Sequence, residues 1–515
     1  MSEQSPALEL RRVNKSFGPV HANRDISLSV DRGSIHGIVG ENGAGKSTLM
    51  SIVYGFYQAD SGEILVNGMP CHIDSPQSSI KAGIGMVHQH FMLVDTFTVL
   101  ENIILGIEGG YRLTKGLAAA RDELIRLEKE YTLEVNVDAI VGDLPVGLRQ
   151  RVEILKALYR QAEILILDEP TGVLTPQEAS HLFRILGALR QQGKTVILIT
   201  HKLREIMAIT DNVSVMRRGE MVAHVKTAET TRAALAELMV GRSVLLRVEK
   251  TPAKPAETLL AIRNLKYVDM DNVPRLKGID LDLKAGEILG IAGVSGNGQS
   301  ELLEVLGGIL SPTSGSIQYK GQELVKSKAF SARNLRKIGV GHVPEDRHRA
   351  GLVLSFSANE CIILGYQDSP EYNRGLRLDR SAMVRNSETY IEKYDIRPPD
   401  AYLKASGFSG GNQQKLVLAR EMEQAPDVLL VGQPTRGVDI GAIEFIHKQL
   451  IKMRDAGKAI LVVSVEIDEV MSIADRIAVM FDGKIVGEVN AEDATETRLG
   501  LMMAGVREST TPEMT

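Results

Sequence analysis

The stretch Gly40–Ser47 reads GENGAGKS and fits the pattern G-x-x-x-x-G-K-[ST], in which a glycine-rich turn joins a strand to a helix. An apolar run, IHGIV, precedes the stretch, and a segment of helical character, TLMSIVY, follows it. Glycines in such a turn let backbone N–H groups point inward around phosphate oxygens at a helix N-terminus. The stretch therefore predicts a phosphate-binding loop (P-loop) within an α/β fold.

The residue types in this loop predict ATP and Mg²⁺ as its ligands. Lys46 is expected to reach the terminal phosphates and to act in catalysis, and Ser47 is expected to offer its hydroxyl to Mg²⁺. The alternative is a chance match to the pattern, against which the strand–loop–helix context counts. The other positions expected to contact the nucleotide are Gly40, Glu41, Asn42, Gly43, Ala44, Gly45 and Thr48.

Two further strand ends supply polar groups of the kind that ATP hydrolysis needs. In ILILDEP, four apolar residues precede Asp168, a candidate Mg²⁺ ligand, and Glu169, a candidate to orient and polarise the attacking water. His201 ends the run VILITH and is a candidate donor to the γ-phosphate. The alternatives are two solvated acids and a structural histidine. The P-loop favours the catalytic interpretation of all three residues.

Two other candidates for nucleotide contact rest on weaker patterns. Gln89, in GMVHQHF, follows an apolar run and is a candidate contact to Mg²⁺ and the water. His88 and His90 flank it, but without a third ligand at hand, solvated or packing histidines are favoured over a metal site. Phe17, in VNKSFG, is a candidate stacking platform for adenine; an ordinary core aromatic is equally consistent with the periodicity.

The chain of 515 residues carries this pattern twice. The segment GSIHGIVGENGAGKS recurs as GEILGIAGVSGNGQS, and AEILILDEPTG recurs as PDVLLVGQPTR. Short apolar runs alternate with amphipathic segments in each copy, which predicts an α/β domain with a mainly parallel sheet. A helical subdomain is expected as an insertion near residues 118–138. The predicted organisation is a first domain at 1–247, a linker at 248–257, a second domain at 258–505 and a flexible tail at 506–515.

The second copy lacks the groups on which the chemistry of the first depends. Because positioning and charge neutralisation make up most of phosphoryl-transfer catalysis, this copy is expected to hydrolyse ATP very poorly. The paired positions are Lys46 and Gln299, Asp168 and Gly432, Glu169 and Gln433, Gln89 and Glu345, and His201 and Val465.

One motif is more complete in the second copy than in the first. Phe408–Lys415 reads FSGGNQQK, whereas its counterpart, Leu144–Arg151, reads LPVGLRQR. Pro145 replaces a serine and removes both a hydroxyl and an N–H group. Each half thus has the motif that the other has lost.

Composition excludes several other classes of protein. A formal net charge of -5 gives no basic footprint, so nucleic acid is not an expected partner. The two cysteines, Cys71 and Cys361, lie far apart and indicate neither a disulfide framework nor a zinc site. The first residues lack the pattern of a signal peptide, and no run of eighteen apolar residues occurs. A role at a membrane would therefore require a partner that holds the chain there.

Taken together, these motifs resemble the ATPase subunits of ABC transporters: P-loop, glutamine loop, SGGNQ signature, strand-end Asp-Glu and histidine, in that order, twice. In that family two such domains dock head to tail, with ATP between the P-loop of one and the signature of the other. The resemblance implies that Ser409, Gly410, Gly411 and Asn412 complete the site of the first P-loop. The other pairing, GVSGNGQS with LPVGL, is expected to be inert or nearly so.

Two fused domains with GNQQK and QPTRGVD resemble the importers of simple sugars and nucleosides, and HQHFMLVDTFTVLENIILG is similar to nucleoside-type members. The resemblance implies two transmembrane permease subunits, a substrate-binding protein and a peripheral position on the cytoplasmic face of the cell membrane. Segments 89–106 and 345–365 would contact the permease. The alternatives are the same role for ribose- or galactose-like sugars, or a soluble tandem ABC protein acting on ribosomes.

Overall fold

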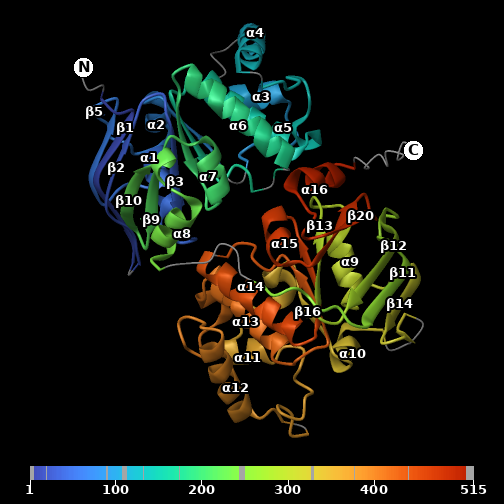
Figure 1. Cartoon of the computed structure of the whole chain (residues 1–515). Helices are drawn as coiled ribbons and strands as arrows, with labels where there is room; N and C mark the ends of the chain where they lie inside the picture. Colours follow the sequence, from blue (N-terminus) through green and yellow to red (C-terminus); the bar gives the residue numbers. More distant parts are fainter. Residues whose placement is uncertain are drawn as a thin grey trace, which may run out of the picture. The chain divides into compact units, whose positions relative to one another are not determined.

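The computed structural model describes residues 5–18, 20–88, 91–106, 113–131, 133–172, 174, 176–242, 250–325, 330–375, 377–438 and 440–505. The chain divides into two compact units, Met1–Val244 and Leu245–Thr515. The elements follow one another in the same general order in both units, as the labels and colours of Figure 1 show.

A six-stranded sheet forms the centre of the first unit, in the order β10-β9-β3-β8-β7-β6. Strand β10 is antiparallel to β9, and the other strands run parallel. Every residue of the four strands on the β3 to β6 side is buried, as the apolar runs predicted. The strands are β3 (Ile35–Gly40), β6 (Ile84–Val87), β7 (Ile164–Asp168), β8 (Thr195–Ile199), β9 (Asn212–Arg217) and β10 (Glu220–Lys226).

A second, antiparallel sheet, in the order β2-β1-β4-β5, was not predicted from the sequence. Its apolar side chains share one core with helix α1 (Lys46–Tyr54) and with the central sheet. Strand β1 contributes Leu8 and Leu10 to this core, and helix α1 contributes Leu49 and Val53. The strands are β1 (Leu8–Phe17), β2 (Val20–Val30), β4 (Ser61–Val66) and β5 (Met69–Pro70).

The inserted helical segment of the first unit is shorter than the sequence indicated. Helix α4 (Leu113–Tyr131) ends well before residue 138, and residues 133–138 are not helical. There Leu133, Val135 and Val137 are buried in alternation, a period of two that a helix does not produce. The remaining helices are α2 (Pro76–Lys81), α3 (Val99–Ile104), α5 (Val146–Tyr159), α6 (Pro176–Gln191), α7 (Leu203–Ile209) and α8 (Arg232–Val240), with 3₁₀ turns at Val141–Asp143 and Thr227–Glu229.

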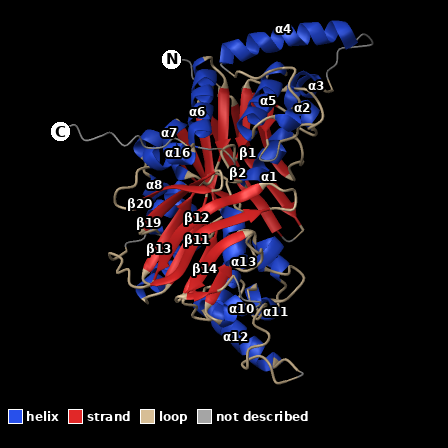
Figure 2. Ribbon diagram, turned by 90° about the vertical axis from the view of Figure 1, so that its right-hand side faces the viewer, coloured by secondary structure: helices blue, strands red, loops and turns tan. Residues whose placement is uncertain are grey.

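The second unit repeats both sheets, in the orders β12-β11-β14-β15 and β16-β17-β18-β13-β19-β20. Figure 2 shows these strands together with the helices around them. The strands are β11 (Thr258–Val268), β12 (Pro274–Lys284), β13 (Glu287–Ala292), β14 (Ser314–Tyr319), β15 (Gln322–Glu323), β16 (Val340–Val343), β17 (Val428–Gly432), β18 (Ala459–Ser464), β19 (Arg476–Phe481) and β20 (Lys484–Asn490).

The helices of the second unit also follow the order of the first. They are α9 (Gln299–Leu306), α10 (Ala332–Lys337), α11 (Ala358–Ile362), α12 (Arg380–Lys393), α13 (Gly410–Met422), α14 (Ile440–Asp455), α15 (Ile467–Ile473) and α16 (Glu496–Met503), with a π-helical turn at Arg347–Gly351 and a 3₁₀ turn at Ala405–Gly407.

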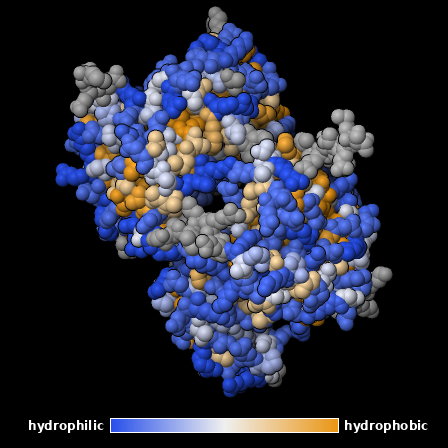
Figure 3. All heavy atoms as spheres, viewed as in Figure 1, coloured by the Kyte–Doolittle hydropathy of each residue, from blue (hydrophilic) through white to orange (hydrophobic). Residues whose placement is uncertain are grey.

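The visible surface of the protein is mostly hydrophilic, with apolar side chains in scattered patches (Figure 3). Among the residues that the structure describes, no helix combines the length and the apolar character needed to cross a membrane.

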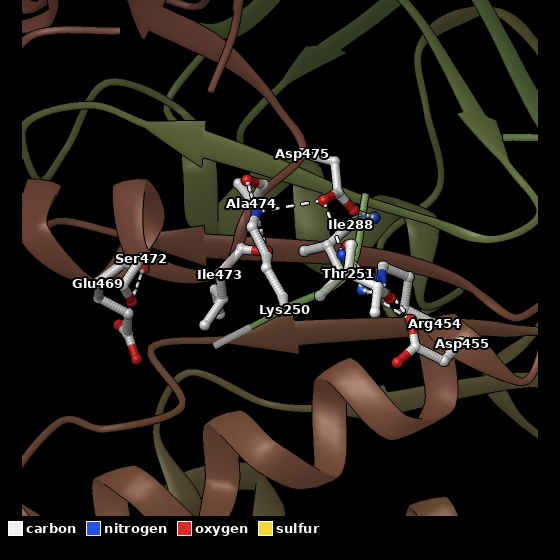
Figure 4. Close-up of polar contacts among 10 residues, drawn as sticks. All are labelled: Lys250, Thr251, Ile288, Arg454, Asp455, Glu469, Ser472, Ile473, Ala474 and Asp475. Atoms are coloured by element: carbon white, nitrogen blue, oxygen red, sulfur yellow. Dashed lines mark hydrogen bonds and ion pairs between the residues drawn. The ribbon is translucent and has the colours of Figure 1, made fainter. Parts of the chain in front are cut away.

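A buried cluster of ion pairs in the second unit binds residues 250 and 251, near the beginning of that unit (Figure 4). Arg454 of α14 donates to Asp475 at 2.9 Å, and Asp475 accepts from the backbone N–H of Ile288 on β13 at 2.9 Å. The ammonium of Lys250 lies 3.1 Å from the same carboxylate, and Arg454 also donates to the carbonyl of Thr251 at 2.9 Å. Residues 250 and 251 are thus fixed to the second unit by charge-assisted hydrogen bonds.

The first unit has the matching ion pair, but it is much more exposed to solvent. Arg190 of α6 donates to Asp211 at 2.8 Å, and Asp211 accepts from the N–H of Ile35 at 2.8 Å. The side chains of Arg190 and Asp211 are 38% and 39% exposed, whereas those of Arg454 and Asp475 are 1% and 12% exposed. The same pair of residue types is therefore solvated in one unit and desolvated in the other.

This difference predicts unequal costs for the same substitution. Asp475, which precedes β19, is the buried carboxylate that Arg454 and Lys250 share. Asp475→Ala leaves Arg454 with only the partly exposed Asp455 as its acidic partner, so we expect the second unit to lose about 3 kcal/mol of unfolding free energy. Asp211→Ala removes a solvated pair and one backbone hydrogen bond, so we expect a loss of about 1–2 kcal/mol in the first unit. Calorimetric unfolding of both variants beside the wild type measures this. Equal losses would contradict the account.

Candidate functional site

The P-loop of the first unit lies between the end of β3 and the start of α1. Gly45 caps α1 with φ of 98°, and a Cβ at this position would come within 2.2 Å of the carbonyl oxygen of Ala22. No other residue type fits this turn without movement of the backbone. The accessible part of the loop consists of Glu41, Asn42 and Gly43. After them, Ala44 is buried and Thr48 lies in the first turn of α1.

Lys46 is buried and folds back over the loop that it follows. Its ammonium donates to the carbonyl oxygens of Gly40 at 2.8 Å and Glu41 at 3.0 Å. Burial lowers the pKa of Lys46, and the nearby carboxylates of Glu169 and Asp168 oppose that shift. The ammonium therefore lies at the centre of the loop, where phosphate oxygens would replace the carbonyl groups as its acceptors.

Ser47 and Asp168 form a pair suited to a divalent cation. Asp168 ends β7 and is buried. Burial raises the pKa of Asp168, while the nearby Ser47 hydroxyl opposes the shift. The Oδ1 atom of Asp168 is buried without a hydrogen-bond partner. A hydroxyl and an unsatisfied carboxylate oxygen are hard ligands of the kind that Mg²⁺ prefers, so these residues fit the ion.

Glu169 and His201 meet at the carboxyl ends of two neighbouring strands. Glu169 has φ of 46°, and its N–H donates to the carbonyl of Ile199 at the end of β8 at 2.8 Å. This turn brings Oε1 of Glu169 to 2.9 Å from Nδ1 of His201. The hydrogen bond from His201 is the main cause that lowers the pKa of Glu169. The carboxylate is thus kept ionised, as acceptance of a proton requires.

Of the remaining candidate residues of the first unit, the structure describes Phe17 and His88 but not Gln89 or His90. Phe17 is 43% exposed, so the alternative of a core aromatic is wrong; its ring makes an edge contact with Tyr57. His88 packs against the rings of Tyr54 and Phe56.

The second unit keeps the shape of the loop and changes its chemistry. Gly298 caps α9 with φ of 100°, and Gln299 is buried in the place of Lys46, with Nε2 donating to the carbonyl of Val294 at 3.0 Å. Gln433, in the place of Glu169, accepts from the backbone N–H of Val465 at 3.3 Å. The Gln433 amide therefore contacts Val465, the counterpart of His201, through the backbone.

The signature motif begins helix α13 in the second unit. The hydroxyl of Ser409 accepts from Asn412 Nδ2 at 2.9 Å and caps the helix. A Cβ at Gly410 would lie 2.7 Å from Nη2 of Arg347, so a larger residue does not fit there without displacement of the arginine. In the first unit Pro145 precedes α5 without a side-chain cap, and an exposed Val146 follows it. Ser409–Asn412 therefore belong to a unit other than the one that holds Lys46, Asp168, Glu169 and His201.

Sequence reasoning assigned no role to Glu345 beyond its place in the glutamine loop. In the structure its carboxylate accepts from the hydroxyl of Ser300, the counterpart of Ser47. The signal was present in the sequence: Glu345 appears where the first copy has Gln89, and Gly432 appears where it has Asp168. The second unit thus gains a carboxylate just after β16 and loses one at the end of β17.

Comparisons with known proteins agree with this geometry. A sequence model described as "ABC transporter" matches residues 23–172 and 276–436. A nucleoside import ATP-binding protein, NupA of Lactococcus lactis subsp. cremoris (strain MG1363), is 46% identical over 97% of this chain and 98% of its own length. A guanosine import ATP-binding protein, NupO of Bacillus subtilis (strain 168), is 47% identical over 97% of each chain. A glucose import ATP-binding protein, TsgD13 of Haloferax volcanii, is 42% identical over 98% and 97%.

The bond between His201 and Glu169 predicts a shift in the pH dependence of ATP hydrolysis. The His201→Ala change removes the main cause that lowers the pKa of Glu169, so this pKa rises. Because the ionised carboxylate is the active form, we expect the residual turnover to begin its acidic decline at a higher pH than in the wild type. Turnover measured between pH 4 and 8 tests this, with the exposed His72→Ala as control. An acidic limb that stays in place would contradict the assignment.

Proposed function

Because the chain belongs to the ABC transporter family, we propose that it is the ATP-hydrolysing subunit of a nucleoside importer. The observation that carries the proposal is full-length identity of 46–47% to two proteins named for nucleoside and guanosine import. The first unit supports it independently, because Lys46, Asp168, Glu169 and His201 converge at one end of the central sheet.

The first P-loop binds the phosphates of ATP. Its backbone N–H groups and the ammonium of Lys46 contact the phosphate oxygens, and Phe17 stacks on the adenine. Ser47, Asp168 and Gln89 would hold a Mg²⁺ ion. When bound, Mg²⁺ neutralises charge on the β- and γ-phosphates.

Glu169 acts on the attacking water, and His201 acts on the γ-phosphate. Glu169 accepts a hydrogen bond from the attacking water and draws off its proton as the new P–O bond forms. His201 donates to the γ-phosphate through Nε2, the ring nitrogen opposite the Nδ1 that lies 2.9 Å from the carboxylate of Glu169. Both groups stabilise charge that develops in the transition state.

The signature residues Ser409, Gly410, Gly411 and Asn412 serve the ATP held by the first P-loop. The support is the distribution of motifs over the sequence, because each half carries the complete motif that the other lacks. The exposed Ser409 hydroxyl and the start of helix α13 supply hydrogen-bond donors that suit an anion.

A cavity in the first unit suits a segment of a permease subunit. It has a volume of about 260 Å³ and is lined by residues of α1, α2, β6 and α5. Met92 and Leu105 line it and expose 55% and 42% of their surface. Glu153, another lining residue, is 3% exposed, and its Oε1 atom makes no hydrogen bond but lies 3.9 Å from the ammonium of Lys156. An apolar helix end that also offers a hydrogen-bond donor to this carboxylate matches the lining.

With two permease subunits and a substrate-binding protein, the chain would work as a peripheral subunit on the cytoplasmic face of the cell membrane. ATP-driven closure at the nucleotide site would move the permease segments, and hydrolysis would release them. A second candidate is the same role for a simple sugar, which the glucose import relative favours.

The test is uptake into proteoliposomes that contain the permease subunits and the chain, with ATP on the side of the chain. We expect labelled guanosine or uridine to accumulate and glucose not to. Glu169→Gln should lower both ATP turnover and uptake by about 10²-fold or more, because the water loses its base. Ser409→Ala should have a similar effect.

Gln433→Ala is the matched control, because it alters the counterpart of Glu169 in the second unit. Its turnover should stay near that of the wild type. Full activity in the Glu169→Gln variant, or loss of turnover in a folded Gln433→Ala variant, would overturn the assignment of the site. Glucose uptake without nucleoside uptake would overturn the choice of substrate and leave the ATPase site intact.

A further inference from the structure

The second unit still presents a carboxylate to the serine of its loop. Ser300 donates to Glu345, and in the first unit the Ser47 hydroxyl lies near Asp168. The two carboxylates come from different strands. Asp168 ends β7, whereas Glu345 follows β16, which lies beside the counterpart of β7 in the central sheet of its own unit. The pairing of hydroxyl and carboxylate has been kept although the residue that supplied it is gone.

The space around Gly432 shows that the two replacements belong together. A Cβ at Gly432 would lie 2.9 Å from the backbone nitrogen of Glu345 and 3.0 Å from its Cα. It would also lie 2.8 Å from Cδ1 of Leu303. An aspartate at position 432 is therefore excluded unless the backbone after β16 moves. The glycine makes room for the chain that carries Glu345 to the loop.

The loop that faces Glu345 is preformed and fits phosphate. A Cβ at Gly298 would come within 2.6 Å of the carbonyl oxygen of Arg275, so the turn depends on glycine as in the first unit. Gln299 repeats the return of Lys46 to the loop carbonyls but carries no charge. The loop N–H groups remain, and the positive charge that would balance the phosphates has been lost.

We propose that the second loop binds an Mg²⁺-nucleotide, with Ser300 and Glu345 as the protein's ligands to the cation, and retains it without hydrolysis. This rests on the proposed function, because it takes ATP as the ligand of the family's loops. A hydroxyl and a carboxylate are oxygen ligands suited to Mg²⁺, and the cation supplies the charge that Gln299 does not. Retention follows from Gln433 and Val465, since neither can accept a proton from water.

The test uses the full chain with Lys46→Ala, which weakens the first loop and leaves the second as the main site. Mn²⁺ replaces Mg²⁺ as the probe, with the non-hydrolysable ATP analogue AMP-PNP. Electron paramagnetic resonance measures how much Mn²⁺ is bound, and electron spin echo modulation detects the phosphorus of a coordinated phosphate. We expect one Mn²⁺-nucleotide per chain with phosphorus coupling.

Adding Glu345→Gln or Ser300→Ala should weaken Mn²⁺ binding by about tenfold or more, because each removes a ligand. The matched control is Glu301→Gln, which removes the same charge from the first turn of α9. It should leave Mn²⁺ binding unchanged. Far-UV circular dichroism verifies that each variant is folded.

Absence of Mn²⁺-nucleotide binding in the Lys46→Ala chain would overturn the proposal. So would Glu345→Gln binding as tightly as its parent, or more tightly, since the carboxylate would then be idle or would repel the phosphates. The test does not depend on turnover. The inference can therefore fail while Glu169→Gln still abolishes uptake, and the proposed function can fail while the second loop still binds Mn²⁺-nucleotide.

Discussion

The tight turn from a central strand into the following helix is the constraint on which both units depend. Gly45 and Gly298 cap α1 and α9 with φ of 98° and 100°, and a Cβ at either would collide with the carbonyl oxygen of a strand in the antiparallel sheet. The second sheet therefore does more than complete the core, because its backbone limits the turn to glycine. This turn also sets the position of the loop that is expected to bind phosphate.

With the shape of the loop held constant, charge decides what each unit does. The first unit surrounds its loop with Lys46, Asp168, Glu169 and His201, of which the ammonium and the carboxylates are buried or partly buried. The second has lost all four and gained Glu345. Because phosphoryl transfer depends on fixed charges more than on covalent chemistry by the protein, we expect the second unit to hydrolyse ATP very poorly.

The sequence predicted what depends on neighbours along the chain: the strand–loop–helix at Gly40–Ser47, the buried strands and the repeat. It predicted the group around Glu169 because parallel strands end at one edge. It missed the antiparallel sheet, whose strands pair across long separations, and the end of α4 at Tyr131. It also missed Glu345 as the partner of Ser300, because that contact depends on the path of the backbone after β16, which spacing does not encode.

The central claim is that one chain hydrolyses one ATP per cycle although it has two loops. The direct measurement is a single-turnover count of ADP per chain in the reconstituted complex. The complex is loaded with labelled ATP without Mg²⁺, and the reaction is started with Mg²⁺ and excess unlabelled ATP. The account predicts one labelled ADP per chain in the fast phase, absent in Glu169→Gln and unchanged in Gln433→Ala. Two labelled ADP per chain in that phase would contradict it.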